Sequence, residues 1–194
     1  IVGGGFAGLT AAVALASQGI RSFVIEADDT VCFGSRSISI SRRSLEIFER
    51  IGAVDAMLAK GLAWTGGRSY YRDTEVLHFT MPHDENQKLP PMINIQQYYL
   101  EEFLVQAAER YPELIDIRWG ARVTGVQSEA DGVRLNIAEP GQTYLLEAGW
   151  VLASDGGRSL MREALGLQLE GTAYEGRYVI ADIELESALP TERL

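Results

Sequence analysis

Apolar residues recur along the chain at spacings that are typical of an α/β fold. Small and apolar side chains at helical spacing predict a helix over residues 7–18, with Gly19 as its stop. An apolar run predicts a strand over 21–26, and Val2 is expected to end an earlier strand. These elements form a β-α-β unit, which is the start of a parallel sheet.

The middle of the chain predicts further helices and a set of short strands. One helix is expected from Ser41, as its N-cap, to Ile51, and an amphipathic helix is expected over 97–110. Loops are expected over 28–37 and 81–91. Alternating apolar residues predict a hairpin and then a β-meander inserted in the α/β fold, with strands over 64–71, 75–80, 121–128, 133–138 and 143–148.

The residues after the meander predict a turn between a strand and a helix. A short buried strand is expected over 150–153, and residues 155–157, Asp-Gly-Gly, form a turn. Ser159 is placed to cap a helix that ends at Leu165. A final strand is expected over 177–186.

Composition and charge exclude several classes of protein. The net charge is −10 and no basic run is longer than Arg42-Arg43, so we expect no nucleic-acid partner, which would need clustered Lys and Arg. No apolar run approaches the roughly 20 residues of a membrane span. The single cysteine, Cys32, indicates a reducing, cytoplasmic compartment, and the spacing of His78 and His83 indicates no metal site.

A glycine motif stands between the first strand and the first helix. Residues 3–8, Gly-Gly-Gly-Phe-Ala-Gly, fit G-x-G-x-x-G. Gly3 allows the tight turn, Gly5 lets the backbone approach a pyrophosphate, and Gly8 lets the helix lie close to the strand. The N-terminus of the helix then offers free N–H groups and a positive dipole end. The candidate phosphate-binding residues are Gly3, Gly5, Phe6, Ala7 and Gly8.

An acidic residue closes the second predicted strand. Glu26 lies 18 residues past Gly8, where it is placed to accept hydrogen bonds from a ribose hydroxyl, and Ala27 follows it. A carboxylate there repels a 2′-phosphate, so the nucleotide is expected to be FAD or NAD and not NADP. The glycine motif alone does not separate FAD from NAD.

A second motif, D-G-x-x-S-x-x-R, runs from Asp155 to Arg162. One interpretation is a carboxylate on a strand-to-helix turn, with Gly156 letting a cofactor come close. The plainer interpretation is an Asp-Gly turn followed by a serine N-cap at Ser159, and for this motif taken alone it is favoured.

Together these motifs resemble the class A flavoprotein aromatic hydroxylases, which share the p-hydroxybenzoate hydroxylase fold. Four stretches occur in the order of that family: residues 3–26, 34–52, 97–104 and 155–162. The residues of these stretches are most similar to those of the branch that contains 3-(3-hydroxyphenyl)propionate hydroxylase. The resemblance spans nearly the whole chain.

The resemblance implies FAD as the cofactor and assigns further residues to it. Arg36 matches the arginine of the family that reaches the flavin side, although it could also be a solvated loop residue. Gln97 matches a polar FAD contact, with a helix N-terminal residue as the alternative, and Val123 matches a backbone contact near the adenine. Asp155 and Gly156 match the motif associated with both FAD and NAD(P)H. No catalytic residue is named, because in this family the flavin itself carries the oxygen chemistry.

The resemblance also implies domains and an activity. Residues 1–170 would form a Rossmann-like FAD-binding domain with a parallel sheet and the inserted meander, and 171–194 would begin a substrate-binding domain. NADH or NADPH, as a transient co-substrate, would reduce FAD, and one oxygen atom of O₂ would pass to a small aromatic substrate, usually a phenol. A homo-oligomer is left open. The chain lacks a starting Met and the later G-D motif of the family, so we expect it to be part of a longer protein.

Three alternatives stay open. The first is another FAD enzyme of the same fold, such as a halogenase or a prenyl reductase, although the pattern from Arg36 to Glu46 favours a hydroxylase. The second is an NAD-dependent dehydrogenase, against which the meander and the Asp-Gly turn argue. The third is a non-catalytic folding or FAD-binding unit.

Overall fold

The computed structural model describes residues 1–34, 36–177, 179, 181, 186 and 191–193. The chain divides into two compact units. The first comprises residues 1–33 and 104–178, and the second comprises 34–103 and 179–194. None of the helices formed by the described residues is both long enough and apolar enough to cross a bilayer.

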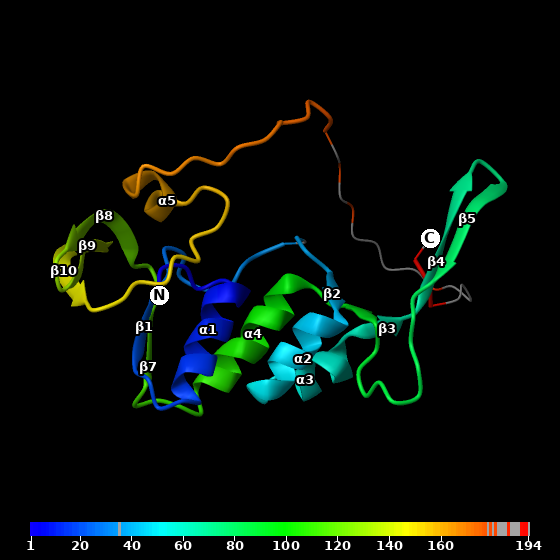
Figure 1. The fold of residues 1–194 in the computed structure, drawn as a ribbon, viewed down its shortest axis with the longest axis horizontal. Helices are drawn as coiled ribbons and strands as arrows, with labels where there is room; N and C mark the ends of the chain where they lie inside the picture. Colours follow the sequence, from blue (N-terminus) through cyan, green and yellow to red (C-terminus); the bar gives the residue numbers. More distant parts are fainter. Residues whose placement is uncertain (35, 178, 180, 182–185, 187–190, 194) are drawn as a thin grey trace. The chain divides into compact units, whose positions relative to one another are not determined.

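The first unit is built on parallel strand pairing (Figure 1). β1 (Ser22–Ile25) pairs in parallel with β7 (Ile115–Arg118), from Ser22 opposite Ile115 to Ile25 opposite Arg118. On the other side of β1, Val2 forms parallel bridges with both Ile25 and Ala153. The predicted β-α-β unit with a parallel sheet is therefore confirmed.

Helix α1 (Phe6–Ala16) connects Val2 to β1 and packs against this layer. It buries the apolar positions that the helical spacing singles out, which are Leu9, Ala12, Val13 and Ala16. Gly19 follows the helix with φ of +75°, a conformation that glycine adopts without strain, and the chain reverses there into β1. Burial of this small-residue face brings the N-terminus of α1 to the carboxyl end of the strands.

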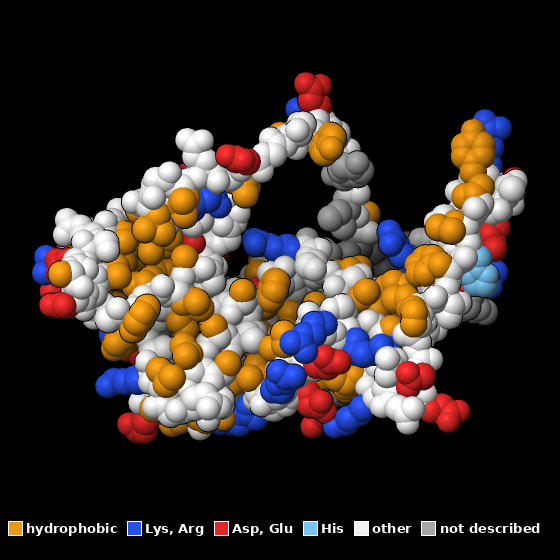
Figure 2. Space-filling model, in the orientation of Figure 1, with side chains coloured by type: hydrophobic (Ala, Val, Ile, Leu, Met, Phe, Trp, Pro, Cys, Tyr) orange, Lys and Arg blue, Asp and Glu red, His pale blue; other side chains and the backbone are white. Residues whose placement is uncertain are grey.

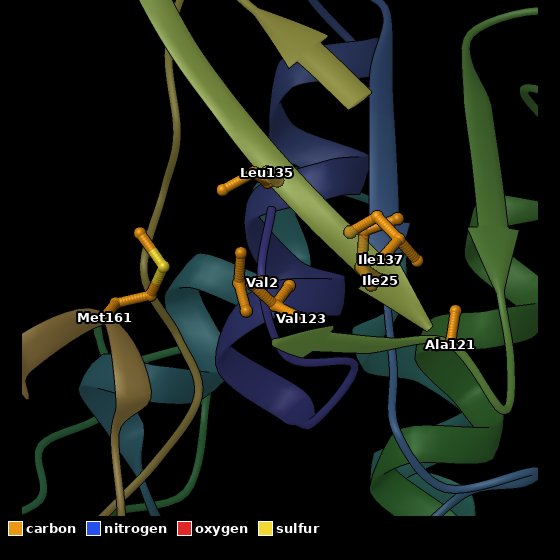
Figure 3. Packing of buried hydrophobic residues seen from close by; sticks show 7 residues of the cluster. All are labelled: Val2, Ile25, Ala121, Val123, Leu135, Ile137 and Met161. Carbon is orange, nitrogen blue, oxygen red and sulfur yellow. The ribbon is translucent and has the colours of Figure 1, made fainter. Parts of the chain in front are cut away.

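The meander is an antiparallel sheet of three consecutive strands, as predicted (Figure 1). Its strands are β8 (Arg122–Glu129), β9 (Gly132–Glu139) and β10 (Gln142–Ala148), in the order β10-β9-β8. The core of the first unit joins the meander to the parallel layer and to α5 (Leu160–Ala164), as Figure 3 shows. That core consists of Val2, Ile25, Ala121, Val123, Leu135, Ile137 and Met161.

The second unit contains helices and short antiparallel strands. Its helices are α2 (Arg42–Arg50), α3 (Val54–Lys60) and the first part of α4 (Gln97–Ala108). One sheet has the order β2-β6-β3 and comprises β2 (Ser39–Ser41), β6 (Met92–Asn94) and β3 (Leu62–Trp64). β4 (Gly66–Tyr71) and β5 (Thr74–Thr80) form a separate hairpin, over which exposed hydrophobic side chains gather (Figure 2).

The structure corrects two of the sequence predictions. The segment 150–153 is not a buried strand: only Ala153 pairs, and the side chain of Trp150 is 94% exposed. In the parallel register Val2 lies opposite Ala153, and Gly3 then turns away with φ of +101°, so pairing does not continue past this bridge. Ser41 does occupy the N-cap position of α2, but its side chain makes no capping hydrogen bond.

Other elements differ in extent or were not predicted. Trp64 belongs to β3 and not to the hairpin strand β4. The elements without a sequence prediction are α3 and the short strands β2, β3, β6 and β7. The strand predicted over 177–186 falls largely outside the described residues.

Candidate functional site

The glycine turn leads directly into the N-terminus of α1. Gly5 is the N-cap residue, with φ of −70° and ψ of 176°, and no side chain caps the helix. The first N–H groups of an α-helix have no acceptor within the helix, so an uncapped end leaves them available to a ligand. Phe6 and Ala7 are exposed at this end. The arrangement fits an anion such as a pyrophosphate, because the N–H groups and the helix dipole both favour negative charge.

Close contacts explain why glycine occupies three positions in this turn. A Cβ on Gly8 would lie 1.9 Å from the carbonyl oxygen of Gly3, and one on Gly3 would lie 2.4 Å from the carbonyl oxygen of Ser154. A Cβ on Gly4 would lie 2.9 Å from the Cβ of Glu26. The tight turn at Gly3 and the close packing at Gly8 follow the prediction. The need for glycine at Gly4 was missed, because it depends on a residue that is distant in sequence.

Glu26 follows β1 and lies against the glycine turn. Its Oε2 accepts a hydrogen bond from the N–H of Gly4 at 2.5 Å, and its Oε1 accepts one from the N–H of Asp28 at 2.9 Å. The predicted position, at the end of the adjacent parallel strand, is therefore confirmed. A carboxylate has about four lone-pair sites, so these two bonds leave acceptor capacity for ribose hydroxyls. Ala27 is half-buried in the bend that follows.

Ser154 approaches the same turn from the far end of the first unit. Its single hydroxyl hydrogen is shared between the carbonyl oxygens of Val2, at 2.9 Å from Oγ, and Gly3, at 3.2 Å. Its backbone N–H also donates to Val2, at 2.8 Å. Ser154 was not predicted from the sequence. Its position directly before the Asp155-Gly156 pair was the only signal available.

The D-G-x-x-S-x-x-R motif forms a local cap for α5. The carboxylate of Asp155 accepts hydrogen bonds from the hydroxyl of Ser159 at 2.7 Å and from the N–H of Met161 at 3.0 Å. Burial raises the pKa of Asp155, but these hydrogen bonds outweigh it and hold the pKa below its ordinary value. Ser159 in turn accepts from the N–H of Arg162, as the N-cap prediction requires. Gly156 has φ of +75°, which suits a glycine turn.

Val123 lies buried at the start of β8, near the position of Glu26. The N–H of Ala121 donates to the carbonyl oxygen of Glu26 at 2.8 Å, which ties the beginning of β8 to the end of β1. A register shift follows Val123, between it and Gly125. The structure thus brings together the glycine turn, Glu26, Val123 and Asp155 within the first unit.

Arg36 and Gln97 belong to the second unit. Arg36 is exposed in the irregular segment before β2. Gln97 is the first residue of α4, and its Nε2 donates to Oε1 of Glu101 at 2.8 Å. Glu101 is only 2% exposed, so this bond helps to solvate a buried carboxylate. The role of each residue toward a flavin stays a prediction.

Known proteins place this geometry in a family. The sequence family described as "FAD binding domain" matches residues 1–193. A 3-(3-hydroxy-phenyl)propionate/3-hydroxycinnamic acid hydroxylase from Mycolicibacterium smegmatis is 31% identical over 183 residues, which cover 94% of this chain and 32% of that protein. A para-nitrophenol 4-monooxygenase from a Pseudomonas strain is 27% identical, over 97% of this chain and 47% of that protein. The first of these relatives belongs to the predicted hydroxylase branch.

Solved structures agree with the sequence relatives. The flavin-dependent monooxygenase PieE, in complex with FAD and substrate, matches with a TM-score of 0.79 and 25% identity, over 88% of this chain and 32% of that one. A complex of aklavinone-11 hydroxylase with FAD and aklavinone matches with a TM-score of 0.71 and 26% identity, over 85% and 34% of the two chains. The chain spans about a third of the length of the hydroxylase from Mycolicibacterium smegmatis. The expected α/β fold and FAD cofactor are confirmed, and the chain belongs to the family of FAD binding domains.

Proposed function

We propose that this chain binds the ADP portion of FAD in a flavin-dependent monooxygenase that hydroxylates an aromatic compound. One observation carries the proposal: the uncapped N-terminus of α1 lies beside a carboxylate, Glu26, at the carboxyl end of a parallel strand pair. Phosphate and ribose are the two groups that such a pair recognises. The family match supports FAD as the nucleotide.

Each candidate residue has a defined task in this proposal. The N–H groups at the start of α1, from Gly5 to Gly8, donate to the pyrophosphate, and Glu26 accepts from the ribose. The backbone of Ala27 and Val123 contacts the adenine side. Arg36 contacts the flavin side, Gln97 makes a polar contact with FAD, and the Asp155-Gly156 turn adjoins the cofactor.

The activity of the whole protein is part of the same proposal. FAD, once bound, supplies the electron transfer and the oxygen chemistry. NADH or NADPH is the reductant, O₂ is the oxidant, and a small phenolic compound is the substrate. Support comes from the relatives, whose names describe hydroxylases and monooxygenases of hydroxyphenyl-propionate and para-nitrophenol. We place the protein in the cytoplasm, and self-association is a further element of the proposal that sedimentation can test.

The test is a binding competition with the full chain. FAD is titrated by the quenching of its fluorescence, and ADP, NAD and NADP are added as competitors. We expect ADP to displace FAD and NADP to compete at least about tenfold more weakly, because Glu26 repels a 2′-phosphate. Absence of FAD binding, or competition by NADP as strong as that by ADP, would contradict the proposal.

A further inference from the structure

The peptide group between Gly3 and Gly4 is held from both sides. Its N–H donates to Oε2 of Glu26 at 2.5 Å. Its carbonyl oxygen accepts from Oγ of Ser154 at 3.2 Å, and the same hydroxyl hydrogen is shared with the carbonyl oxygen of Val2 at 2.9 Å. The same oxygen lies against Gly8, where a Cβ would be only 1.9 Å away. Two side chains that are far apart in the sequence, those of Glu26 and Ser154, therefore hold one peptide group.

The orientation of this peptide decides what the turn presents to a phosphate. Glycine populates positive and negative φ with similar ease, and Gly3 already has φ of +101°. A run of glycines without restraint would therefore sample rotated peptide planes. A half-turn of the Gly3–Gly4 plane would turn the carbonyl oxygen of Gly3 toward Oε2 of Glu26, where the N–H of Gly4 now points, and would change the path of the chain into Gly5 and α1. Holding the plane keeps the N–H groups of the turn in a fixed arrangement before the ligand arrives.

Hydrogen bonds of Ser154 and of the next residue hold the Ser154 backbone in place. Its backbone N–H bonds to Val2, and the next residue, Asp155, is tied to Ser159 and Met161 at the start of α5. The hydroxyl of Ser154 therefore reaches the glycine turn from a rigid segment. Glu26 holds the opposite edge of the peptide and bonds to the N–H of Asp28 as well.

We infer that Ser154 is a positioning residue for the pyrophosphate of the cofactor, and that it acts with Glu26 by fixing the Gly3–Gly4 peptide plane. The inference rests on the proposed function, because it takes FAD as the ligand. It adds a task to Glu26: the carboxylate orders the turn in addition to accepting from the ribose. It also explains how the segment before the Asp-Gly motif acts on a glycine motif that is 151 residues away.

The experiment compares Ser154→Ala with a matched control, Ser17→Ala. Ser17 also donates its hydroxyl to a backbone carbonyl, that of Ala14 at 2.7 Å, but it lies at the opposite end of α1. Affinities for FAD and for ADP are measured by titration of the full chain. Exchange of the Gly4 amide proton is followed by NMR without ligand, and the thermal midpoint is recorded for each variant.

We expect Ser154→Ala to weaken the binding of FAD and ADP by about three- to tenfold, as the loss of one hydrogen bond implies, and to speed exchange at Gly4. Ser17→Ala should leave both quantities at the wild-type value. Unchanged affinity or unchanged Gly4 exchange in Ser154→Ala would overturn the inference. A Ser154→Ala chain that fails to fold would overturn it too, since Ser154 would then serve stability.

The outcomes also separate this inference from the proposed function. A wild-type chain that binds neither FAD nor ADP overturns both. A wild-type chain that binds both ligands, together with a Ser154→Ala variant that binds them equally well, overturns the positioning role alone.

Discussion

Replacing Gly8 by alanine would place a methyl group 1.9 Å from the carbonyl oxygen of Gly3 and 2.8 Å from Oγ of Ser154. The oxygen of Gly3 is a backbone atom whose peptide plane is held by Glu26 and Ser154, so it does not move aside as a flexible side chain would. An ordinary contact needs about 3.4 Å, so α1 must move by about 1.5 Å relative to the turn (3.4 minus 1.9). Introducing an extra carbon into such a packed site typically costs about 1–3 kcal/mol.

For a chain of this size, that cost corresponds to a thermal midpoint lowered by about 2–12 °C. The shift also displaces the N–H groups that face the pyrophosphate, so we expect FAD affinity to fall by at least about tenfold. Scanning calorimetry and FAD titration measure the two effects. Gly149→Ala is the matched control, because a Cβ on Gly149 meets no atom within 4 Å. The reasoning is refuted if Gly8→Ala and Gly149→Ala melt and bind FAD alike.

Three further predictions follow from named contacts. Glu26→Ala should weaken FAD binding by about 1.5–3 kcal/mol for each charged hydrogen bond lost, as titration will show, and unaltered affinity would speak against the ribose role. Tyr144→Phe removes a hydroxyl that donates to Glu139 at 2.6 Å and accepts from Arg118 at 2.9 Å. The substitution should lower the free energy of unfolding, measured by denaturant titration, by about 1 kcal/mol, and an unchanged free energy would refute this role of the hydroxyl. The pKa of Asp155 is lowered in the fold, so its carboxylate stabilises the protein above the unfolded pKa of about 3.9, and this contribution is lost as pH falls through the folded pKa. Asp155→Asn should therefore destabilise the chain most at neutral pH and progressively less below about pH 4, whereas a difference independent of pH would contradict this.

Sequence patterns predict the longer elements of this fold and miss the short ones. The helix at 6–16 and the three meander strands each contain more than one full repeat of their apolar spacing. β2, β3 and β6 have only three residues each, which is too short for an alternation to be distinguished from chance. The prediction at 150–153 was wrong because an apolar run indicates burial, whereas Trp150 is exposed and pairing is limited to Ala153.

The site, too, contains residues that the sequence predicts and residues that it does not. The positions of Gly3, Gly8 and Glu26 follow from a motif whose spacing encodes the turn itself. Gly4 and Ser154 could not be found in this way, because their roles arise from contacts with residues 22 and 151 positions away. Such contacts exist only once the parallel strands bring the ends of the first unit together.

The central claim is that the N-terminus of α1 binds the pyrophosphate of FAD, and amide NMR of the full chain tests it most directly. Adding FAD or ADP should shift the amide resonances of residues 5–8 and leave that of Ser17, at the far end of the helix, in place. In Gly5→Val, where a side chain enters the space of the pyrophosphate, FAD binding should weaken by more than about tenfold and the shifts should vanish at the same ligand concentration. Saturating FAD binding that leaves the amides of residues 5–8 unshifted would contradict the account.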